Sequence, residues 1–263
     1  MNRLRVTPQA LAKRRFLTRL LGLGGSAVLA GCDRLGGTPA FQQVLRTGES
    51  LSRGVHRQLG GRRSMAQEFA PADLSPSFRG NGNTDPDSAA YKALAAGGFA
   101  GWTLRVDGLV QRPLNLSLAE LRAMPSRTQI TRHDCVEGWS AIAQWTGVPL
   151  SRVLAAARPR AEARFVVFHC ADTFGDGDRQ TPYYESIDMD DAYHPQTLLA
   201  YALNGRPLPV TNGAPLRLRV ERQLGYKHAK YLMRLQLVDR FDTIGGGRGG
   251  YWEDQGYQWY AGI

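Results

Sequence analysis

The sequence contains one cysteine whose neighbours suit redox metal chemistry. Cys135 ends a run of β-type residues and shortly precedes Gly138, a residue that favours turns. The other residues around it are charged or aromatic: Arg132, His133, Asp134, Glu137 and Trp139. A thiolate beside an arginine, at the edge between a strand and a loop, is expected to have a lowered pKa and to be available to a soft metal.

The spacing of cysteine and histidine excludes most metal centres that proteins build from their own side chains. The sequence has no Cys-x-x-Cys and no His-x-x-x-His pair, whereas a zinc site needs four donors at recognisable spacing. Iron-sulfur clusters and c-type haem are excluded for the same reason. A metal that brings most of its own ligands needs a single cysteine, as molybdenum in a pterin dithiolene does. A disulfide between Cys135 and Cys170 is the structural alternative.

Two motifs near Cys135 resemble the molybdenum domain of the sulfite oxidase family. The first is Arg-His-Asp-Cys-Val-Glu-Gly-Trp at 132–139, and the second is Trp-x-Gly-Val-Pro-Leu at 145–150. The resemblance extends from about residue 102 to residue 239. It favours the bacterial periplasmic branch, which includes the catalytic subunit of the methionine sulfoxide reductase system. It implies that Cys135 is the one protein ligand of a molybdenum-molybdopterin cofactor.

A second, distant segment carries the same resemblance. Residues 204–209, 212–220 and 225–230 read Asn-Gly-Arg-Pro-Leu-Pro, Asn-Gly-Ala-Pro-Leu-Arg-Leu-Arg-Val and Gly-Tyr-Lys-His-Ala-Lys. A pterin cofactor ends in a phosphate or a nucleotide, so it needs arginine or lysine donors and a close backbone approach, which glycines permit. The resemblance implies that five residues contact or surround the pterin tail: Asn212, Arg217, His228, Ala229 and Lys230.

Three further positions are candidates for the same site. Asn81 begins Asn-Gly-Asn-Thr-Asp, where family members often read Asn-x-x-Tyr-Glu in a loop that touches the pterin, so only Asn81 is carried over. Cys170 stands where some relatives have a threonine beside the cofactor, and its alternative interpretation is a small core residue. His133 is the histidine nearest Cys135, and it is a candidate for proton transfer or for positioning.

The basic residues also have structural interpretations. Arg217 and Arg219 alternate along a strand, so they share one side of it, which is either a ligand site or a solvated face. Lys227 and Lys230 are either cofactor donors or ordinary surface lysines. His194, in Tyr-His-Pro, is interpreted as a residue that packs a helix.

The elements that must position these residues are mostly strands. Alternating or continuously apolar segments predict strands at 103–110, 127–135, 165–168, 216–220 and 231–238. Ser117 and Glu120 form a capping box for a short helix that ends before Pro125, and Ser151 is expected to cap a helix over 152–157. Residues 188–203 have helical apolar spacing despite Pro195. These patterns predict an α+β, strand-dominated mixed fold, of the molybdopterin-binding type found in sulfite oxidases.

The N-terminus resembles an export signal. A cationic start precedes the apolar stretch 16–30, which is shorter than the ~20 residues of a membrane-spanning helix. Arg14-Arg15 resembles the twin-arginine signal of proteins exported in the folded state, and Leu-Ala-Gly-Cys32 resembles the site at which bacterial lipoproteins are acylated. Residues 1–32 are therefore expected to be a signal, with the protein in the periplasm and a possible inner-membrane anchor at Cys32.

The remaining chain is expected to be one domain with a lead-in. Residues 33–77 are rich in Gly, Ser, Arg and Pro and are interpreted as a tether and irregular lead-in, and 78–263 as a single molybdopterin-binding domain without an Ig-like dimerisation domain, hence a monomer. Of the net charge of +10, six charges lie in the first 31 residues. The balance of +4 that remains argues against a nucleic-acid partner.

The expected activity is two-electron oxygen-atom transfer on a small S-oxide, N-oxide or sulfur oxyanion. No haem or flavin motif is present in the sequence, so electrons are expected to pass to or from a separate partner, a membrane haem protein or a cytochrome. One alternative is a non-catalytic periplasmic lipoprotein that binds an anion. Another is a thiol redox protein that uses Cys135 and Cys170. The aromatic tail 245–263 is interpreted either as a lid over the pocket or as a docking surface for a partner.

Overall fold

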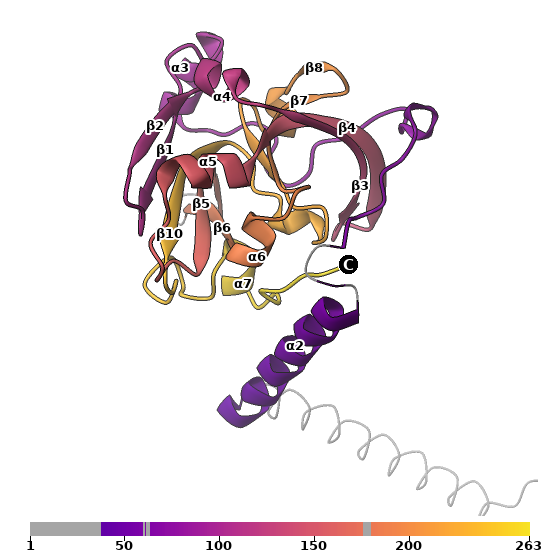
Figure 1. The fold of residues 1–263 in the computed structure, drawn as a ribbon, viewed down its shortest axis with the longest axis vertical. Helices are drawn as coiled ribbons and strands as arrows, with labels where there is room; N and C mark the ends of the chain where they lie inside the picture. The colour runs from indigo at the N-terminus through magenta and orange to yellow at the C-terminus, as the bar shows by residue number, and fades with distance from the viewer. Residues whose placement is uncertain (1–37, 60, 62–63, 176–179) are drawn as a thin grey trace, which may run out of the picture. The chain divides into compact units, whose positions relative to one another are not determined.

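The computed structural model describes residues 38–59, 61, 64–175 and 180–263. The signal and acylation site expected at 1–32 lie outside these residues. The chain divides into two compact units, Met1–Val55 and His56–Ile263. The second unit contains every strand of the described residues, and Figure 1 shows their arrangement.

Five strands of the second unit form a mixed sheet in the order β2-β1-β10-β5-β6. β1 and β10 pair in parallel, and the other neighbours are antiparallel. A register irregularity interrupts the pairing of β5 and β6 between His169 and Thr173. The strands are β1 (Thr103–Gly108), β2 (Leu114–Ser117), β5 (Phe165–Phe174), β6 (Thr181–Asp188) and β10 (Leu232–Val238).

The second sheet is antiparallel and contains a long hairpin. Its order is β3-β4-β7-β8, and β9 pairs with β7. β3 and β4 curve together in Figure 1, and their pairing runs from Arg127 opposite Gly147 to Cys135 opposite Trp139. The hairpin therefore carries Cys135 to its tip. The strands are β3 (Arg127–Cys135), β4 (Trp139–Pro149), β7 (Leu198–Leu203), β8 (Arg206–Pro207) and β9 (Arg217–Arg219).

The helices of the second unit are short, and one core joins both sheets. The core includes Leu104 of β1, Phe168 of β5, Val148 of β4 and Leu218 of β9, together with the buried face of α5. The α+β, strand-dominated prediction is therefore confirmed. The helical elements are η1 (Pro71–Asp73), α3 (Ala89–Ala96), α4 (Leu118–Ala123), α5 (Leu150–Ala157), α6 (Met189–Ala192), η3 (Val210–Asn212), η4 (Gly225–Lys227) and α7 (Tyr251–Asp254).

Of the two helix caps predicted from the sequence, one is present in the structure. The capping box is present, since the Ser117 side chain accepts from the amide of Glu120 and the Glu120 carboxylate accepts from the amide of Ser117. The cap expected at Ser151 was wrong: α5 begins one residue earlier, at Leu150, and no side chain caps it.

The helix predicted from the apolar spacing at 188–203 is also wrong for most of this segment. Only α6 is helical, and residues 198–203 form β7, which pairs with β4 and β9. Proline at 195 has no amide to continue a helix, and the two neighbouring strands supply hydrogen bonds that a helix would have left unused. Strand pairing therefore outweighed the periodicity.

The lead-in expected to be irregular contains a helix, α2 (Pro39–Leu59). Its apolar residues are separated by three, four or seven positions, which places them on one face of an amphipathic helix: Phe41, Val44, Leu51, Val55 and Leu59. Pro39 occupies the first position, where a missing amide is harmless. The composition of the segment concealed this pattern. None of the described helices is both long and apolar enough to span a bilayer.

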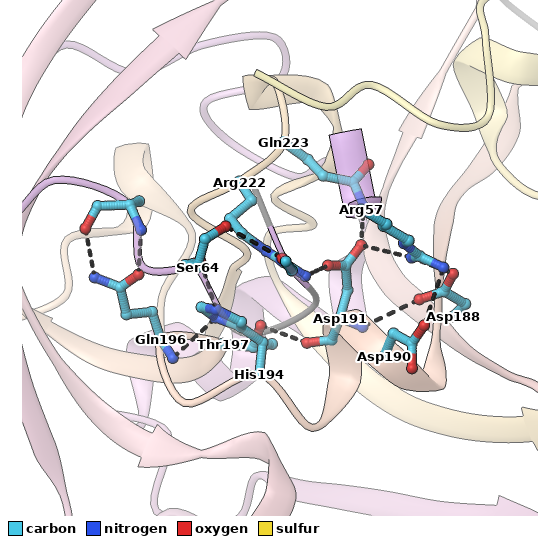
Figure 2. Close-up of polar contacts among 12 residues, drawn as sticks. Arg57, Ser64, Asp188, Asp190, Asp191, His194, Gln196, Thr197, Arg222 and Gln223 are labelled. Atoms are coloured by element: carbon cyan, nitrogen blue, oxygen red, sulfur yellow. Dashed lines mark hydrogen bonds and ion pairs between the residues drawn. The ribbon is translucent and has the colours of Figure 1, made fainter. Parts of the chain in front are cut away.

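Described residues between 57 and 77 are bonded into the second unit, so the ordered body begins before the expected boundary at Phe78. In Figure 2 the Arg57 guanidinium points at three carboxylates near α6, and the shortest of these contacts joins Arg57 Nη2 to Asp188 Oδ2 at 2.5 Å. Further along, the amide of Phe69 donates to Ile130 and that of Ser75 to Ile142, both through main-chain carbonyls.

His194 and Gln196 also bond to this segment, His194 at Ser64 (Figure 2) and Gln196 at Ala66. His194 Nε2 lies 3.1 Å from the carbonyl oxygen of Ser64, and its Nδ1 accepts from the amide of Gln196 at 3.2 Å. The Gln196 side chain both accepts from and donates to the main chain of Ala66, at 2.7 and 3.0 Å. His194 therefore anchors this segment, a role that the predicted packing against a helix did not include.

Candidate active site

A cavity of about 190 Å³ opens beside Cys135. Four of the predicted site residues line it: Asn81, Cys135, His228 and Lys230. The lining also contains two carboxylates, Glu137 and Asp172, and a set of aromatic residues. The cavity thus combines a cysteine, buried polar groups and an apolar wall, which is the usual composition of a small-molecule site.

Cys135 lies at the tip of the β3–β4 hairpin. The amide of Gly138 donates to the Cys135 carbonyl at 3.0 Å, and Gly138 has a φ of +82°, which a residue with a side chain rarely adopts. The thiol is buried, at 8% exposure. Burial raises its pKa, although the amide of Glu137 opposes this effect. The lowered pKa predicted from the nearby arginine is therefore wrong for the protein alone, because burial outweighs the charge.

Glu137 fastens the loop at Asn81 to this hairpin. Its Oε1 accepts from the amide of Gly82 at 3.1 Å, and its Oε2 accepts from Trp139 Nε1 at 3.0 Å. These hydrogen bonds lower the pKa of Glu137, and the one from Trp139 has the largest effect. The glutamate is therefore a carboxylate with its acceptors in use.

Lys230 bonds to the main chain of the same loop. Its Nζ donates to the carbonyl oxygens of Asn81 and Asn83, at 2.5 Å each. Burial, followed by the charge of Arg217, lowers its pKa to about 8. The lysine that was expected to donate directly to a cofactor thus orients a loop, and the side-chain oxygen of Asn81 remains without a partner.

Arg217 and Arg219 are fully buried on one side of β9, so the solvated face considered for them is excluded. Their guanidinium carbons lie 5.0 and 4.4 Å from the ring centre of Trp145. Arg219 is neutralised by Glu221, with an Nε to Oε1 distance of 2.9 Å. Arg217 makes one hydrogen bond, from Nη1 to the carbonyl of Asn212 at 3.0 Å.

Arg217 therefore carries a buried charge that the described residues satisfy only in part. Its Nε and Nη2 have no partner, and burial together with the charge of Arg219 lowers its pKa to about 9. An anionic group at this position would remove the imbalance, because buried charges are normally paired.

His133 and His228 stack edge to face, with ring centres 5.0 Å apart. His133 Nδ1 accepts from Arg219 at 2.9 Å, which fixes it as a neutral ring with its hydrogen on Nε2. Burial, with the charge of Arg219, holds its pKa well below the ordinary value, and the pKa of His228 is lowered in the same way. This geometry favours His133 as a neutral hydrogen-bond donor that positions a ligand.

The other predicted residues lie around this cluster and do not line the cavity. The side chain of Asn212 is buried, and its amide donates to the carbonyl of Phe78 at 3.5 Å. The amide of Ala229 donates to the carbonyl of Lys227 at 3.1 Å, so it is not free for a ligand. Cys170 contacts the backbone of Lys230, and burial raises its pKa well above the ordinary value. Both described cysteines are free thiols with raised pKa values, which opposes a thiolate redox pair.

Buried polar atoms without a partner are concentrated here. Four predicted residues carry such atoms: Asn81 (Oδ1), His133 (Nε2), Arg217 (Nε and Nη2) and His228 (Nδ1). Thr131 Oγ1 and Trp145 Nε1, on β3 and β4, share the property. Because buried polar groups in proteins are nearly always hydrogen-bonded, these donors and acceptors fit a large polar ligand with an anionic end, as a pterin with its phosphate is.

Two glycines leave room at the same place. A Cβ on Gly225 would lie 2.6 Å from His133 Nε2, and a Cβ on Gly213, whose φ is +106°, would lie 2.9 Å from Lys230 Cβ. Side chains at either position would displace the residues that surround the cluster. This agrees with the close backbone approach expected from the glycines of the second motif.

The aromatic wall of the cavity was predicted only in part, because one of the two interpretations of the tail was a lid over the pocket, whereas the aromatic residues outside the tail were not singled out. Its members come from β5, β6, η4 and the C-terminal tail: Phe174, Tyr183, Tyr226, Trp252 and Tyr257. Trp252 and Tyr257 stack at 5.3 Å between ring centres. The tail therefore forms part of the cavity. In the sequence, the aromatic residues of this tail were the feature that indicated its contribution.

A buried ion cluster fixes this tail. Lys227 Nζ lies 2.6 Å from Glu185 Oε2 on β6 and also bonds Glu253 on α7, and all three side chains are almost fully buried. Lys227 is therefore not a surface lysine. Burial and the neighbouring Glu253 raise the pKa of Glu185 well above the ordinary value.

Comparisons with known proteins agree with this geometry. The family model described as "oxidoreductase molybdopterin binding domain" matches residues 94–243. The chain is 36% identical over 251 residues to a protein of Azospira oryzae whose name is "Putative protein-methionine-sulfoxide reductase subunit YedZ1", covering 95% of this chain and 88% of that protein. It is 36% identical over 242 residues to the protein-methionine-sulfoxide reductase catalytic subunit MsrP of Xanthomonas axonopodis, covering 86% of this chain and 70% of that protein.

Among solved structures, the sulfane dehydrogenase SoxCD of Paracoccus pantotrophus is similar, with 24% identity and a TM-score of 0.48, over 54% of this chain and 39% of that chain. The family match covers more than half of the sequence and includes all the strands and the Cys135 hairpin. The chain therefore belongs to the oxidoreductase molybdopterin-binding domain family, the sulfite oxidase family that its motifs predicted, and is a molybdopterin-binding oxidoreductase.

Proposed function

We propose that this protein reduces a neutral S-oxide by two-electron oxygen-atom transfer, with methionine sulfoxide as its substrate. Relatives that are 36% identical are named as subunits of protein-methionine-sulfoxide reductases, which supports this direction and substrate class. The single observation that carries the proposal is the charge of the cavity next to Cys135.

The cavity suits a neutral substrate better than an anion. Its described lining includes no arginine, and the lysine that it contains, Lys230, is bonded to two main-chain carbonyls. The lining contains two carboxyl groups, Glu137 and Asp172. A sulfite anion would approach the Glu137 carboxylate, whose charge the exposed Arg79 offsets only in part at 3.5 Å. Close contacts between like charges are unfavourable by several kcal/mol. A sulfoxide carries no net charge, and its methyl and methylene groups match the aromatic wall.

The cofactor is proposed to lie across the cavity and the cluster behind it. Cys135 would be its one protein ligand to the metal, and Arg217, with the side chain of Asn212, would hold the pterin phosphate. His133, His228 and Asn81 would supply the remaining hydrogen bonds through the atoms that have no partner in the protein. When bound, the cofactor supplies two-electron redox chemistry at an oxygen atom.

The chain's own residues orient the substrate and exclude water. Trp252 and Tyr257 form an apolar surface on one side of the cavity. The sulfur would lie against their rings, a contact that favours the thioether product by about 0.3–1.5 kcal/mol. Glu137 and Lys230 hold the loop at Asn81 against the Cys135 hairpin. The sulfoxide oxygen is thereby directed inward, toward the thiol.

We further propose that electrons arrive singly from a separate haem-containing subunit and that the protein works in the periplasm. The relative from Xanthomonas is named as a catalytic subunit, which supports the existence of a second subunit. Arg14-Arg15 and Cys32 motivate export and a lipid anchor. Mass spectrometry of the mature N-terminus tests the anchor, since an unmodified or absent Cys32 would exclude it.

The experiment for the main proposal is a reduction assay with a dithionite-reduced viologen dye. Methionine sulfoxide, trimethylamine N-oxide and sulfite, the last with an electron acceptor, are compared on the same cofactor-loaded preparation. We expect turnover of methionine sulfoxide to exceed that of sulfite by at least about tenfold. Sulfite oxidation as the fastest reaction, or no turnover of any sulfoxide, would reject the proposal.

A further inference from the structure

Asp172 is a buried carboxyl group that none of the sequence motifs explains. It lies on β5 within the register irregularity between His169 and Thr173, and such irregularities re-aim side chains next to active sites. Its side chain is 2% exposed and lines the same cavity as Cys135. Its Oδ1 has no hydrogen-bond partner among the described residues.

Three other acidic groups of the cavity, Glu137, Tyr183 and Tyr226, have committed hydrogen bonds. Glu137 is a carboxylate that accepts from three groups of the Asn81 loop and the hairpin. The hydroxyl of Tyr183 donates to the carbonyl of Tyr226 at 2.7 Å, and that of Tyr226 donates to the carbonyl of Gln258 at 2.7 Å. None of these groups is arranged to give a proton to a ligand.

The basic groups are similarly occupied. His228 Nε2 lies 3.0 Å from the carbonyl oxygen of Gln223, which uses the ring hydrogen of the neutral form. Lys230 donates to the carbonyls of Asn81 and Asn83. Asn81 also has a free side-chain oxygen on the cavity wall, but an amide cannot act as an acid. Asp172 therefore differs from its neighbours, because its free oxygen atom belongs to a carboxyl group.

We propose that Asp172 is a catalytic acid that protonates the oxygen leaving the substrate. This inference rests on the proposed reduction of a sulfoxide. In the balanced reaction one sulfoxide, two electrons and two protons give one thioether and one water: the S–O bond breaks, sulfur gains two electrons and oxygen leaves as water. The electrons come from the external one-electron donor through the reduced cofactor. One proton comes from Asp172 and the other from solvent, which afterwards reprotonates Asp172.

The titration of Asp172 agrees with this role. Burial raises its pKa to about 7, against the opposing charge of Lys230 and a hydrogen bond from the Asp172 backbone. A general acid is most effective when its pKa is close to the working pH. The titratable groups that face it come from its own strand and from three other segments: Cys170, Tyr183, Tyr91, Lys230 and Tyr231.

The proposal predicts the pH dependence of turnover. The acid form of Asp172 is required, so the rate should be highest below pH 7 and should fall as the pH rises through about 7. In Asp172→Asn this limb should disappear, and kcat with methionine sulfoxide should be lowered by at least about 100-fold with KM nearly unchanged. Asp172→Glu keeps an acid and should recover part of the rate, with a displaced limb.

Two further measurements separate an acid from an anchor of the cofactor. Molybdenum and pterin content should be the same in Asp172→Asn as in the parent, and a large loss of either would overturn the proposal. Nuclear magnetic resonance of protein labelled at the aspartate carboxyl carbon should show one carboxyl that titrates near neutral pH and that is missing in Asp172→Asn. Its absence in the parent would also overturn the proposal.

The matched control is Asp107→Asn, which removes another buried carboxylate of the same sheet, one paired with Arg234. This variant should keep the parental kcat and pH limb. If the parent reduces methionine sulfoxide and Asp172→Asn matches it in rate and pH profile, the role of Asp172 fails while the proposed function stands. If the parent reduces no sulfoxide, the proposed function fails, and the carboxyl titration still reports on Asp172.

Discussion

Two arginines of the short strand β9 have different roles, one in the protein framework and one in the candidate cofactor site. Arg219 is bonded to Glu221 and to His133 Nδ1, so it is part of the protein's own framework. Arg217, two residues earlier, keeps two guanidinium nitrogens without partners. Alternation placed both on one face of the strand, but only the fold determines which of them has a carboxylate neighbour.

Replacing Arg217 by Met should therefore have opposite effects on stability and on cofactor binding. The cofactor-free variant should unfold at the same or higher denaturant concentration, because an incompletely satisfied buried charge is exchanged for an apolar chain of similar length. Retention of the cofactor should fall by about 10- to 100-fold, since hydrogen bonds to charged groups are worth about 1.5–3 kcal/mol.

Denaturant unfolding of the cofactor-free protein and pterin release measured by fluorescence test this prediction. Arg240→Met, at an exposed position, is the control. A variant that loses stability without the cofactor and releases pterin at the parental rate would show that Arg217 serves the framework.

The part of the candidate site that belongs to recognisable motifs was predictable from the sequence. Asn81, Cys135, His228 and Lys230 were brought to one cavity as expected. Motifs could not predict Asp172, because an aspartate that follows an apolar strand segment also occurs at an ordinary strand end. The burial that raises the pKa of Cys135 was not predictable either, since it depends on how segments distant in the sequence pack around the hairpin.

At the level of elements, His194 joins the segment after α2 to the loop before β7. Its ring accepts from the amide of Gln196 through Nδ1, so protonation of Nδ1 would break that hydrogen bond. Burial, assisted by the charge of Arg222, lowers the pKa of His194 in the folded protein. A histidine with a lowered pKa contributes stability that is present above its unfolded pKa of about 6.5 and is lost as the pH falls through the folded value.

We therefore predict that the free energy of unfolding decreases more steeply below pH 6.5 in the parent than in His194→Asn. The difference in slope should approach, at most, one proton, about 1.4 kcal/mol per pH unit. Urea unfolding between pH 5 and 8 measures it, with the exposed His56→Asn as control. Equal slopes for the parent and His194→Asn would contradict the anchoring role.

The tail is the second element whose placement depends on a few residues. Burial acts to lower the pKa of Lys227, but Glu185 and Glu253 outweigh it, so the pKa is raised. Lys227→Met leaves two carboxyl groups buried together and should destabilise the protein by about 3–5 kcal/mol at pH 7. The loss should shrink at lower pH, because Glu185, whose pKa is already raised, takes up a proton.

Hydrogen exchange read by mass spectrometry tests where this loss appears. Peptides from 249–257 should exchange faster in Lys227→Met, while those from the β3–β4 hairpin should not. Faster exchange confined to that hairpin would mean that the ion cluster does not fix the tail.

Elements with local signals were predictable, and those decided by distant pairing were not. The strand expected at 127–135 has the observed bounds of β3, and the capping box begins α4. In contrast, β7 replaced a helical pattern because β4 and β9 flank it. The helix α2 was missed because polar composition was weighed more heavily than apolar spacing.

For the whole molecule, the second unit forms one cofactor domain in which two sheets share a core. The β3–β4 hairpin supplies Cys135, β9 and η4 supply the basic cluster, and the C-terminal tail supplies the aromatic wall. These segments are far apart in sequence, so the site exists only in the folded chain. The central claim is that Cys135 is the single protein sulfur on the metal.

X-ray absorption at the molybdenum edge tests that claim most directly, because it counts the sulfur atoms bound to the metal. Cofactor-loaded parent, Cys135→Ser and Cys170→Ser proteins are compared. We expect Cys135→Ser to have one sulfur ligand fewer than the parent and Cys170→Ser to match the parent. An unchanged sulfur count in Cys135→Ser, or a parent purified from molybdate-supplied cells without molybdenum, would contradict the account.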